Sequence, residues 1–446
     1  MEKILIANRG EIAVRIIRTA KQKGIKTVAV HSECDAQALH VRLADESICI
    51  GGNRVKDSYL NTHAIMSACE VSQADAIHPG YGLLSENAEF AQIVEDCKIN
   101  FIGPSPTAMR RLGEKVSARE LAEKANVPLL KGTGIIRDSE HALEEAEKIG
   151  YPVLIKASHG GGGRGMRVVD TAKDMAQNLA SAQSESQGAF GSSEVYMEKF
   201  LKKPRHIEIQ ILADKHGNCI YLGERECSLQ RRHQKIIEEA LSPITEETRE
   251  KMGLSACRLA QVVDYCGLGT VEFLVDEDET FYFMEMNSRI QVEHPVTEMV
   301  TGLDLVSHQI DVAQNKKLAL KQEDIRYSGH AIECRINAED SYNFIPSPGE
   351  ITTYVAPGGP NVRIDSGVYQ GYKVPPFYDS MLAKLICWGK DRAEARLVML
   401  RALSEFVVEG VNTNIELHKK IIESDDFINS NYYTKWIEEQ FIPSIK

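Results

Sequence analysis

The pattern of hydrophobic and polar residues in the first part of the chain switches between that of a strand and that of a helix. Residues 3–31 run as an apolar strand, an amphipathic helix and a second apolar strand. Two further apolar runs, DAIHPG at 75–80 and NFIGPS at 100–105, have the length and turn residues of short buried strands. This order predicts a Rossmann-like α/β domain over residues 1–112. Its first turn holds a single glycine, Gly10, instead of GxGxxG, so a dinucleotide site is not expected.

The pattern changes between about residue 113 and residue 327. Strand-like runs such as YPVLIKAS, EVYMEKF and HIEIQILAD occur there, and a helical pattern covers 139–149. These runs predict a mixed, largely antiparallel section. From 328 to 446, short strands precede the helical stretch 392–406, which predicts a compact α+β end domain.

Polar side chains recur at every second position after the aromatic apolar run that begins the segment 281–294. In an extended backbone, residues two apart share one face of the strand. That face would carry two carboxylates, two amides and a guanidinium, from Glu285, Asn287, Arg289, Gln291 and Glu293. Burying such groups without partners costs several kcal/mol for each group. The alternative interpretation of a single alternating segment of this kind is an edge strand whose polar face is exposed to water.

The residues just before this segment complete a β-hairpin. VEFLV at 271–275 has the pattern of a strand, and DEDET at 276–280 that of an acidic turn. A loop with an even number of residues would place Glu272 opposite Glu285, whereas an odd-length loop would place the two carboxylates on opposite faces. Like charges opposed in a sheet are destabilising unless a cation lies between them, and carboxylate and amide oxygens suit Mg²⁺. The hairpin therefore predicts a metal site at Glu272, Glu285 and Asn287.

Three other segments carry candidate chemistry. The glycine-rich stretch HGGGGRGM at 159–166 follows an apolar strand that contains Lys156, so it is either a phosphate-binding flap or a flexible surface turn. The basic segment SLQRRHQK at 228–235 is either an anion site or a solvated loop that pairs with the glutamates after it. Glu333 and Arg335 share a strand face, which predicts an ion pair between them.

Composition narrows the class of protein. The chain has 446 residues, enough for about two to four domains, and 43% of them are hydrophobic. A net charge of −12 argues against a nucleic-acid-binding or anionic-membrane surface, and no apolar run approaches the ~20 residues that span a bilayer. Ten cysteines without a CxxC pair, and an N-terminus unlike a signal peptide, predict a cytoplasmic protein with reduced thiols.

Taken together, these segments resemble the biotin carboxylase family of ATP-grasp enzymes. The resemblance runs through essentially the whole chain and includes NRGEIAVRIIRTA, HPGYGLLSEN, KASHGGGGRGM, RHIEIQ, ERECSLQRRHQK, FMEMNSRIQVEHPVTE and ECRINAED. The glycine-rich and FMEMNSR stretches are shared with carbamoyl-phosphate synthetase, whereas QRRHQK, RIQVEHPVTE and ECRINAED are more discriminating. His159 is a departure, because many relatives have glycine there. The resemblance implies a Rossmann-like N-terminal domain (1–112), an ATP-grasp core (113–327) with a mobile lid at about 130–203, and an α+β C-terminal domain (328–446).

The resemblance also implies roles for individual residues. The ATP-binding residues would be Lys115, Lys156, Gly162, Gly163, Glu198, Lys199, Phe200, Leu201, His206, Gln230, His233, Glu272 and Glu285. The family's Mg²⁺ or Mn²⁺ ligands, for two ions, match Glu272, Glu285 and Asn287, in agreement with the hairpin. The bicarbonate pocket would contain Lys235, Arg289, Gln291 and the backbone of Val292, and the biotin site Arg335 and Tyr81. The catalytic set would be Arg289, Glu293, Lys235 and Arg335, with Glu293 as the base.

The implied reaction is the ATP-dependent carboxylation of biotin by bicarbonate through carboxyphosphate. Water would destroy that intermediate, so a lid that excludes solvent is expected. The sequence contains no AMKM-type biotinylation site, so biotin is expected on a separate biotin carboxyl carrier protein. The expected assembly is a homodimer that works with carboxyltransferase subunits, most often those of acetyl-CoA carboxylase. The alternatives are a subunit of pyruvate or propionyl-CoA carboxylase, another ATP-grasp ligase such as a carbamoyl-phosphate-forming enzyme, and a non-catalytic nucleotide-binding regulator.

Overall fold

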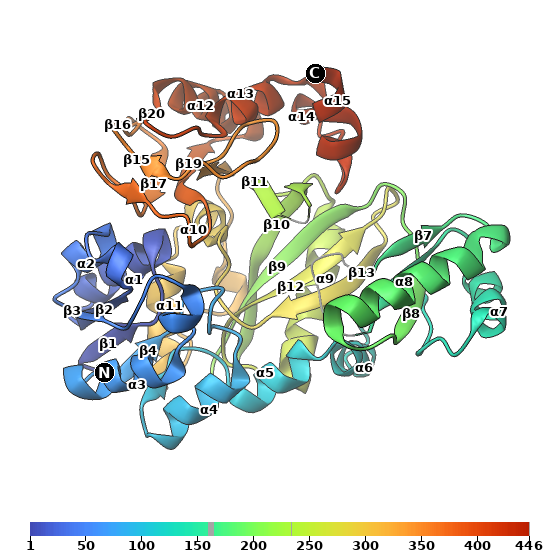
Figure 1. The fold of residues 1–446 in the computed structure, drawn as a ribbon, viewed down its shortest axis with the longest axis horizontal. Coiled ribbons are helices and arrows are strands. Elements are labelled where there is room, and N and C mark those ends of the chain that lie inside the picture. Colours follow the sequence, from blue (N-terminus) through green and yellow to red (C-terminus); the bar gives the residue numbers. More distant parts are fainter. Residues whose placement is uncertain (159–164, 233, 446) are drawn as a thin grey trace.

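The computed structural model describes residues 1–158, 165–232 and 234–445 of the chain. Three of the implied ATP-binding residues, Gly162, Gly163 and His233, lie outside the described residues. In Figure 1 the N-terminal part lies on one side of the central strands and the small layer around α7 and α8 lies on the other, while the C-terminal part lies above the N-terminal part and the central strands.

A parallel five-stranded sheet forms the N-terminal domain, as the βαβ pattern predicted. Its strand order is β3-β2-β1-β4-β5. The strands are β1 (Lys3–Ile6), β2 (Lys26–His31), β3 (Glu46–Cys49), β4 (Ala76–His78) and β5 (Asn100–Phe101). The helices here are α1 (Gly10–Gln22), α2 (Leu39–Leu43), α3 (Thr62–Ser72), α4 (Ala88–Asp96) and α5 (Pro106–Gly113), followed by α6 (Lys115–Lys124). Helix α1 buries Ile12 and Ile16 against the sheet, because its apolar positions recur on one face.

An eight-stranded antiparallel sheet runs through the core and into the C-terminal domain. Its order is β13-β12-β9-β10-β11-β14-β19-β17. The strands are β9 (Arg205–Ala213), β10 (Cys219–Arg231), β11 (Gln234–Ala240), β12 (Gly267–Val275), β13 (Phe281–Asn287), β14 (His330–Asn337), β17 (Val362–Ser366) and β19 (Met381–Gly389). The β11–β14 pairing crosses the expected boundary near residue 328, so the two domains share one continuous sheet.

Alternation along the central strands separates a hydrophobic face from a polar face. On β9, Ile207, Ile209 and Ile211 pack into the core beneath helix α9 (Glu246–Val262). The residues that alternate with them are also buried and belong to the opposite face: His206, Glu208 and Gln210. The same alternation on β12 and β13 places the candidate metal ligands on that polar face. Helices α10 (His294–Thr301) and α11 (Leu305–Ala313) follow β13.

The β12–β13 hairpin has the expected pairing of its carboxylates but an odd-length loop and a β-bulge. Glu272 pairs with Glu285, as predicted. The pair nearest the turn is Val275 with Phe281, which leaves the odd-length loop 276–280. The expectation that such a loop would separate the two carboxylates was wrong, because a bulge next to Glu272 shifts the register by one residue.

The segment expected to be the lid, about 130–203, forms a small layer of its own (Figure 1). Its antiparallel sheet has the order β7-β6-β8, and its hydrophobic core includes Ile155, Leu179 and Met197. The elements are α7 (Ser139–Ile149), β6 (Val153–Ala157), β7 (Arg167–Val169), α8 (Met175–Phe190) and β8 (Val195–Lys199). The predicted helix over 139–149 is confirmed. It begins where the Asp138 carboxylate accepts a hydrogen bond from the His141 N–H at 2.8 Å.

The C-terminal domain packs its helices on the far end of the large sheet. Its remaining elements are β15 (Gly349–Glu350), β16 (Thr353–Val355), β18 (Lys373–Val374), β20 (Val407–Glu409), α12 (Arg392–Glu405), α13 (Ile415–Glu423), α14 (Asp425–Ile428) and α15 (Ile442–Ile445). Two of the short strands expected here, β15 and β16, are close in sequence but pair with different partners, β18 and β20. Among the described residues, no helix has the length and apolar character needed to cross a membrane.

Candidate active site

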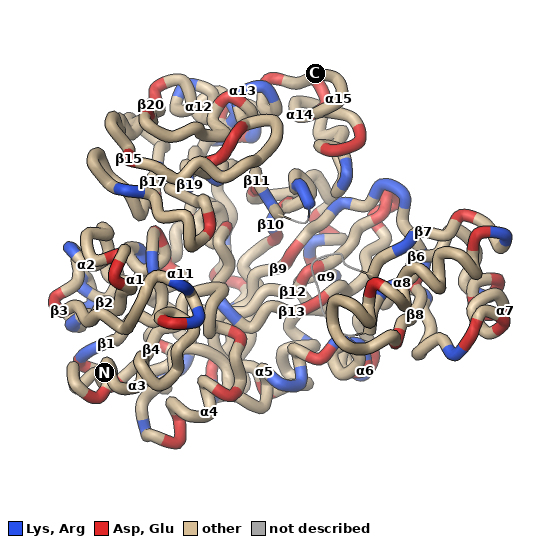
Figure 2. The backbone as a smooth tube through the Cα atoms, viewed as in Figure 1, with Lys and Arg blue, Asp and Glu red and all other residues tan. Residues whose placement is uncertain are grey.

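The ammonium group of Lys235 lies at the centre of the polar face. It contacts three carboxylates, with distances of 2.6 Å to Glu208, 2.7 Å to Glu293 and 3.2 Å to Glu272. Only 11% of the lysine side chain is exposed. Burial alone would lower the pKa of Lys235, but the surrounding negative groups hold it well above its ordinary value. The basic segment at 228–235 is thus no solvated loop at Lys235, where the ammonium is buried among acids. Figure 2 shows both acidic and basic positions along the backbone around β9, β10 and β12.

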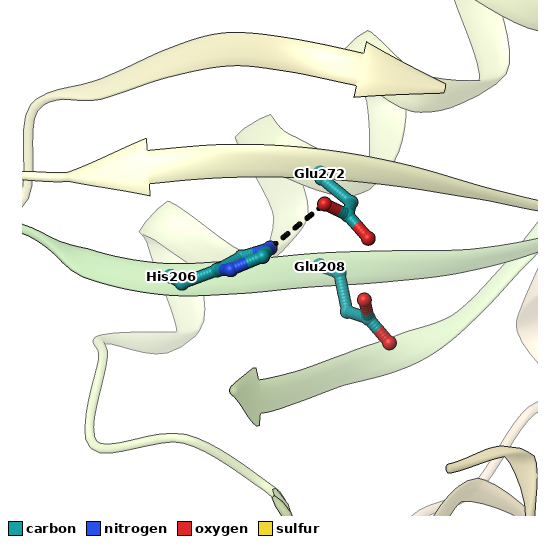
Figure 3. Close-up of side chains that lie close together, drawn as sticks. All are labelled: His206, Glu208 and Glu272. Atoms are coloured by element: carbon teal, nitrogen blue, oxygen red, sulfur yellow. Dashed lines mark ion pairs between the residues drawn. The ribbon is translucent and has the colours of Figure 1, made fainter. Parts of the chain in front are cut away.

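His206, Glu208 and Glu272 form a compact group on the neighbouring strands β9 and β12 (Figure 3). The imidazole Nε2 of His206 lies 3.0 Å from Glu272 Oε2, and one ligand atom from each of the three residues lies within 4.8 Å of the others. Burial alone would raise the pKa of Glu272, but Lys235 and His206 hold it far below its ordinary value. Burial raises the pKa of Glu208, although Arg225 opposes that rise.

The three predicted metal ligands lie together, although their oxygens differ in availability. Glu285 is exposed, and the described residues supply it with neither a hydrogen bond nor an ion pair. Partial burial and the charge of Glu272 raise the pKa of Glu285. Asn287 donates its amide N–H to Glu272 at 2.9 Å and accepts a hydrogen bond from Arg289 at 3.0 Å. An unpaired carboxylate facing a second one gives an oxygen donor set that fits Mg²⁺ or Mn²⁺.

Arg289 and Gln291 connect this hairpin to the N-terminal domain. The Arg289 guanidinium donates to Gln291 Oε1 at 2.9 Å and to Glu86 at 2.9 Å. Gln291 in turn donates to Glu272 at 3.3 Å. The predicted bicarbonate residues therefore converge on one carboxylate, Glu272. Lys235 and Gln291 contact it directly, and Arg289 reaches it through Gln291.

Glu293 lies between two cations. It accepts hydrogen bonds from Lys235 at 2.7 Å and from Arg335 at 3.1 Å, and it is fully buried. Burial alone would raise the pKa of Glu293, but the charges of Lys235, Arg335 and Arg225 hold it well below its ordinary value. The candidate base is therefore ionised at neutral pH.

The predicted ion pair between Glu333 and Arg335 was wrong. Arg335 pairs with Glu238 and Glu293 instead. Both oxygens of Glu333 are buried without a hydrogen-bond partner in the described part of the chain, and burial raises its pKa well above the ordinary value. Glu238 lies directly opposite Glu333 across β11 and β14. Two opposed carboxylates are more stable when only one of them is charged. Arg335 pairs with Glu238, which leaves Glu333 as the carboxylate without a cation partner within the described ranges.

Tyr81 and Val292 contact two residues that sequence reasoning missed. The Tyr81 hydroxyl donates to Glu11, and the Val292 carbonyl oxygen accepts a hydrogen bond from Lys384 at 2.7 Å. Lys384 is the single charged residue in the apolar run MLAKLICW, the same signal that singled out Lys156. Glu208 had a comparable signal, as a charged residue inside the apolar strand HIEIQILAD.

The lid brings a second group of predicted residues together. Glu198 pairs with Lys156 of the lid and with Arg119 of α6. Partial burial and the charge of Lys156 lower the pKa of Lys115. Lys199 donates to the carbonyl oxygens of residues 150 and 151, each at 2.9 Å.

The remaining predicted nucleotide residues lie around this group. Phe200 and Leu201 follow β8 directly, and the Lys435 ammonium lies 5.2 Å from the centre of the Phe200 ring. Gln230 is buried, with its side-chain nitrogen 3.4 Å from His206 Nδ1. The nucleotide candidates therefore line both the lid and the core sheet.

Three family models match the chain in succession. Residues 1–109 match "Biotin carboxylase, N-terminal domain", residues 114–321 match "Carbamoyl-phosphate synthase L chain, ATP binding domain", and residues 333–439 match "Biotin carboxylase C-terminal domain". Biotin carboxylase 1 of Bacillus subtilis is 54% identical over 98% of this chain and 98% of its own.

Solved structures agree with these matches. A biotin carboxylase of Campylobacter jejuni, described as a complex with β,γ-ATP, has a TM-score of 0.94 and 50% identity, and the match covers 98% of each chain. The biotin carboxylase domain dimer of the Hydrogenobacter thermophilus 2-oxoglutarate carboxylase, described with MgADP, ADP and bicarbonate, has a TM-score of 0.93 and 46% identity over 98% of this chain and 97% of its own.

The fold and the matched domains are those of an ATP-grasp ligase, with a Rossmann-like domain before the ATP-binding core and an α+β domain after it. The chain belongs to the biotin carboxylase family. It is an ATP-dependent ligase that carboxylates biotin. The resemblance noted in the sequence is thereby confirmed.

Proposed function

We propose that this chain carries out the first half-reaction of acetyl-CoA carboxylase, the carboxylation of biotin on a separate carrier protein. The observation that carries the catalytic part is the buried ammonium of Lys235 among three carboxylates. Arg335 contacts one of these carboxylates, Glu293, and Arg289 is linked to another, Glu272, through Gln291. The B. subtilis relative, named simply as a biotin carboxylase and matched over 98% of its length, supports a stand-alone subunit. The chain is also 47% identical to a biotin carboxylase subunit of pyruvate carboxylase. The second candidate function is therefore the same half-reaction in a carboxylase with a different acyl acceptor.

Bicarbonate would bind where Lys235, Arg289 and Gln291 converge, with the backbone of Val292 as a fourth contact. Two fixed cations offset the charge repulsion between bicarbonate and the γ-phosphate and hold the bicarbonate oxygen in line. Glu293 would take the bicarbonate proton. A carboxylate paired with two cations is a weak base, but a bound anion would share Lys235 and so raise the basicity of Glu293.

The nucleotide would lie between the lid and the core sheet. Lys115 and Lys156 would contact its phosphates, while Gly162 and Gly163 would close over them. The adenine region would be lined by Glu198, Lys199 and Leu201, with His206 and His233 nearby. Phe200 and Gln230 would also belong to the ATP site. Glu272, Glu285 and Asn287 would hold Mg²⁺ or Mn²⁺, two ions being expected, and such ions neutralise phosphate charge when bound.

Biotin would bind beside Arg335 and Tyr81. Carboxyphosphate would break down to CO₂ and phosphate, and this phosphate would remove the proton from the biotin ureido nitrogen. The Arg335 guanidinium would stabilise the enolate-like oxygen that results, and the nitrogen would then bond to the CO₂ carbon. Arg335 lies 3.1 Å from Glu293, so the biotin and bicarbonate sites would be adjacent.

The domain limits 1–112, 113–327 and 328–446, the homodimer, the carrier and carboxyltransferase partners and the cytoplasmic location stay predictions. The successive family matches support the domain limits. The relative described as a dimer supports the homodimer.

ADP release by the purified chain tests the catalytic proposal. With Mg²⁺ and ATP in buffer depleted of carbon dioxide, we expect ADP release to require added bicarbonate and to increase with free biotin. Stimulation by ammonium ions in place of biotin would favour a carbamoyl-phosphate-forming ligase, and the absence of turnover would favour a nucleotide-binding regulator.

The acyl acceptor needs a separate experiment. The tagged chain would be purified from its own cells, and the subunits that purify with it would be identified. Carboxyltransferase subunits that transfer the carboxyl group to acetyl-CoA are expected. Activity of the purified assembly on pyruvate or propionyl-CoA alone would contradict the acetyl-CoA assignment.

A further inference from the structure

Lys384 is a fully buried lysine on β19 that the reaction as described leaves without a role. Its ammonium donates to the Val292 carbonyl oxygen at 2.7 Å and lies 3.2 Å from Glu11 Oε2. We infer that Lys384 is a positioning residue, which acts with Glu11 to fix the peptide that presents Gln291 and Glu293 to bicarbonate. The inference rests on the proposed bicarbonate site.

The contacts around Lys384 come from three domains. Glu11 belongs to α1 of the N-terminal domain, Val292 follows the core hairpin, and Lys384 lies on the C-terminal part of the large sheet. The Tyr81 hydroxyl donates to the other oxygen of Glu11. A buried lysine and a buried carboxylate are costly unless each is paired, so this group is stable only when the three domains are docked.

Val292 needs such an anchor because it lies in an irregular segment. The segment 288–293 connects β13 to α10 and is neither strand nor helix, so no regular hydrogen-bond ladder fixes the direction of its carbonyl groups. Lys384 fixes the Val292 carbonyl from the side of the C-terminal domain. The next residue, Glu293, is thereby held where Lys235 and Arg335 reach it.

Gln291 precedes the same peptide and contacts the metal hairpin. Its side chain donates to Glu272 at 3.3 Å and accepts from Arg289 at 2.9 Å. A rotation of the Val292 peptide would therefore displace a bicarbonate contact on one side and the base on the other. Misplacement of reacting groups by about 1 Å costs on the order of 100-fold in rate.

The register of the sheet places the anchor beside the biotin residue. Lys384 lies directly opposite Arg335 across β14 and β19. Two neighbouring cations repel, and the structure separates them by assigning Glu11 to Lys384 and Glu238 with Glu293 to Arg335. Glu11 thus keeps the Lys384 ammonium directed to Val292.

A paired substitution tests the inference without leaving an uncompensated buried charge. The double variant Lys384→Met with Glu11→Gln removes both charges, and Lys390→Met, at an exposed position just after β19, is the matched control. ADP release would be measured as a function of bicarbonate and of ATP, with the melting temperature as the check on folding. We expect the KM for bicarbonate to rise about tenfold, and the KM for ATP to change less than about twofold.

The result distinguishes positioning from a merely structural role. A bicarbonate KM that equals that of the wild type, or a parallel rise of both KM values, would overturn the inference. If the double variant does not fold, the isosteric Glu11→Gln carries the test, with an expected rise of about threefold in the bicarbonate KM alone. An unchanged bicarbonate KM in folded Glu11→Gln would overturn the inference equally. Wild-type ADP release that is independent of bicarbonate would instead contradict the proposed function.

Discussion

The lid and the core sheet have opposite charge arrangements around their lysines. At the lid, two cations, Lys156 and Arg119, share the single carboxylate of Glu198. In the core, the single ammonium of Lys235 is shared by three carboxylates. The lid side therefore carries a local surplus of positive charge. On the core side Arg225 also pairs with Glu208 and Arg335 with Glu293, so the surplus of negative charge lies at Glu272 and Glu285.

This difference indicates what each side binds. A positive surplus at Lys115 and Lys156 suits a polyphosphate, whereas paired carboxylates at Glu272 and Glu285 suit divalent cations. A nucleotide with its metal ions would fit between the two sides and complete the charge balance of both. Removing one charge from either side should then affect different kinetic parameters.

The largest effect is expected for Lys235→Met. The change leaves three buried carboxylates without their shared cation and removes a bicarbonate contact. Bicarbonate-dependent ADP release should fall by about 10²–10³-fold, as for the loss of one charge-stabilising group. Lys251→Met, at an exposed position of α9, is the control. Nearly wild-type turnover of the Lys235→Met enzyme would contradict the role assigned to this ammonium among the core carboxylates.

A smaller and more selective effect is expected for Lys156→Met. Without this ammonium the lid side loses part of its positive surplus, so the KM for ATP should rise about tenfold while the KM for bicarbonate changes little. Initial rates at varied ATP and bicarbonate measure both quantities. Lys148→Met, exposed on α7 of the same layer, should behave as the wild type. Equal increases in both KM values would show that lid and core are not separate in function.

Glu285→Gln tests the negative surplus of the core. The amide keeps the shape of the side chain but is a weaker metal ligand, so the Mg²⁺ concentration for half-maximal activity should rise about fivefold. A magnesium titration of ADP release at saturating ATP measures it. Glu277→Gln, at an exposed position in the loop of the same hairpin, is the matched control. An unchanged magnesium requirement would remove Glu285 from the metal site.

The smallest effect concerns the pair of opposed carboxylates behind Arg335. Burial raises the pKa of Glu238 to about 7, with Arg335 opposing the rise and Glu293 adding to it. The folded state therefore holds this proton more tightly than the unfolded state, so the associated stability is complete below about pH 4.5 and is lost as the pH rises through about 7.

Glu238→Gln removes that dependence. The melting temperature of the variant relative to the wild type should increase by about 2–3 °C between pH 5 and pH 8. Glu70→Gln, at an exposed position on α3, should follow the wild type at every pH. A difference that does not vary with pH would mean that Glu238 keeps its charge throughout this range.

Sequence reasoning succeeded where local patterns determine the structure. Period-two polarity, together with an even-length loop, predicted the pairing of Glu272 with Glu285, which the structure has. The loop length was wrong, because the bulge beside Glu272 offsets the odd loop and no local pattern announces a bulge. The helix over 139–149 and the parallel N-terminal sheet followed from periodicity in the same way.

Contacts between distant segments were the part that local patterns could not give. The ion pair of Glu333 with Arg335 was expected from their spacing, but Arg335 pairs with carboxylates on β11 and before α10. The contact of Glu11 with Lys384 joins opposite ends of the chain. Lone charges in apolar strands, such as Lys384, mark such residues, but only the fold reveals their partners.

A crystal structure of the protein with Mg²⁺ and a non-hydrolysable ATP analogue would show whether metal ions join the core carboxylates to the phosphates held by the lid. We expect an ion within about 2.0–2.3 Å of oxygens from both Glu272 and Glu285 and of the phosphates, with Lys156 against the phosphates from the lid side. Ions held only by phosphates and water, with Glu285 directed into solvent and Glu272 bonded only to His206 and Lys235, would contradict this expectation.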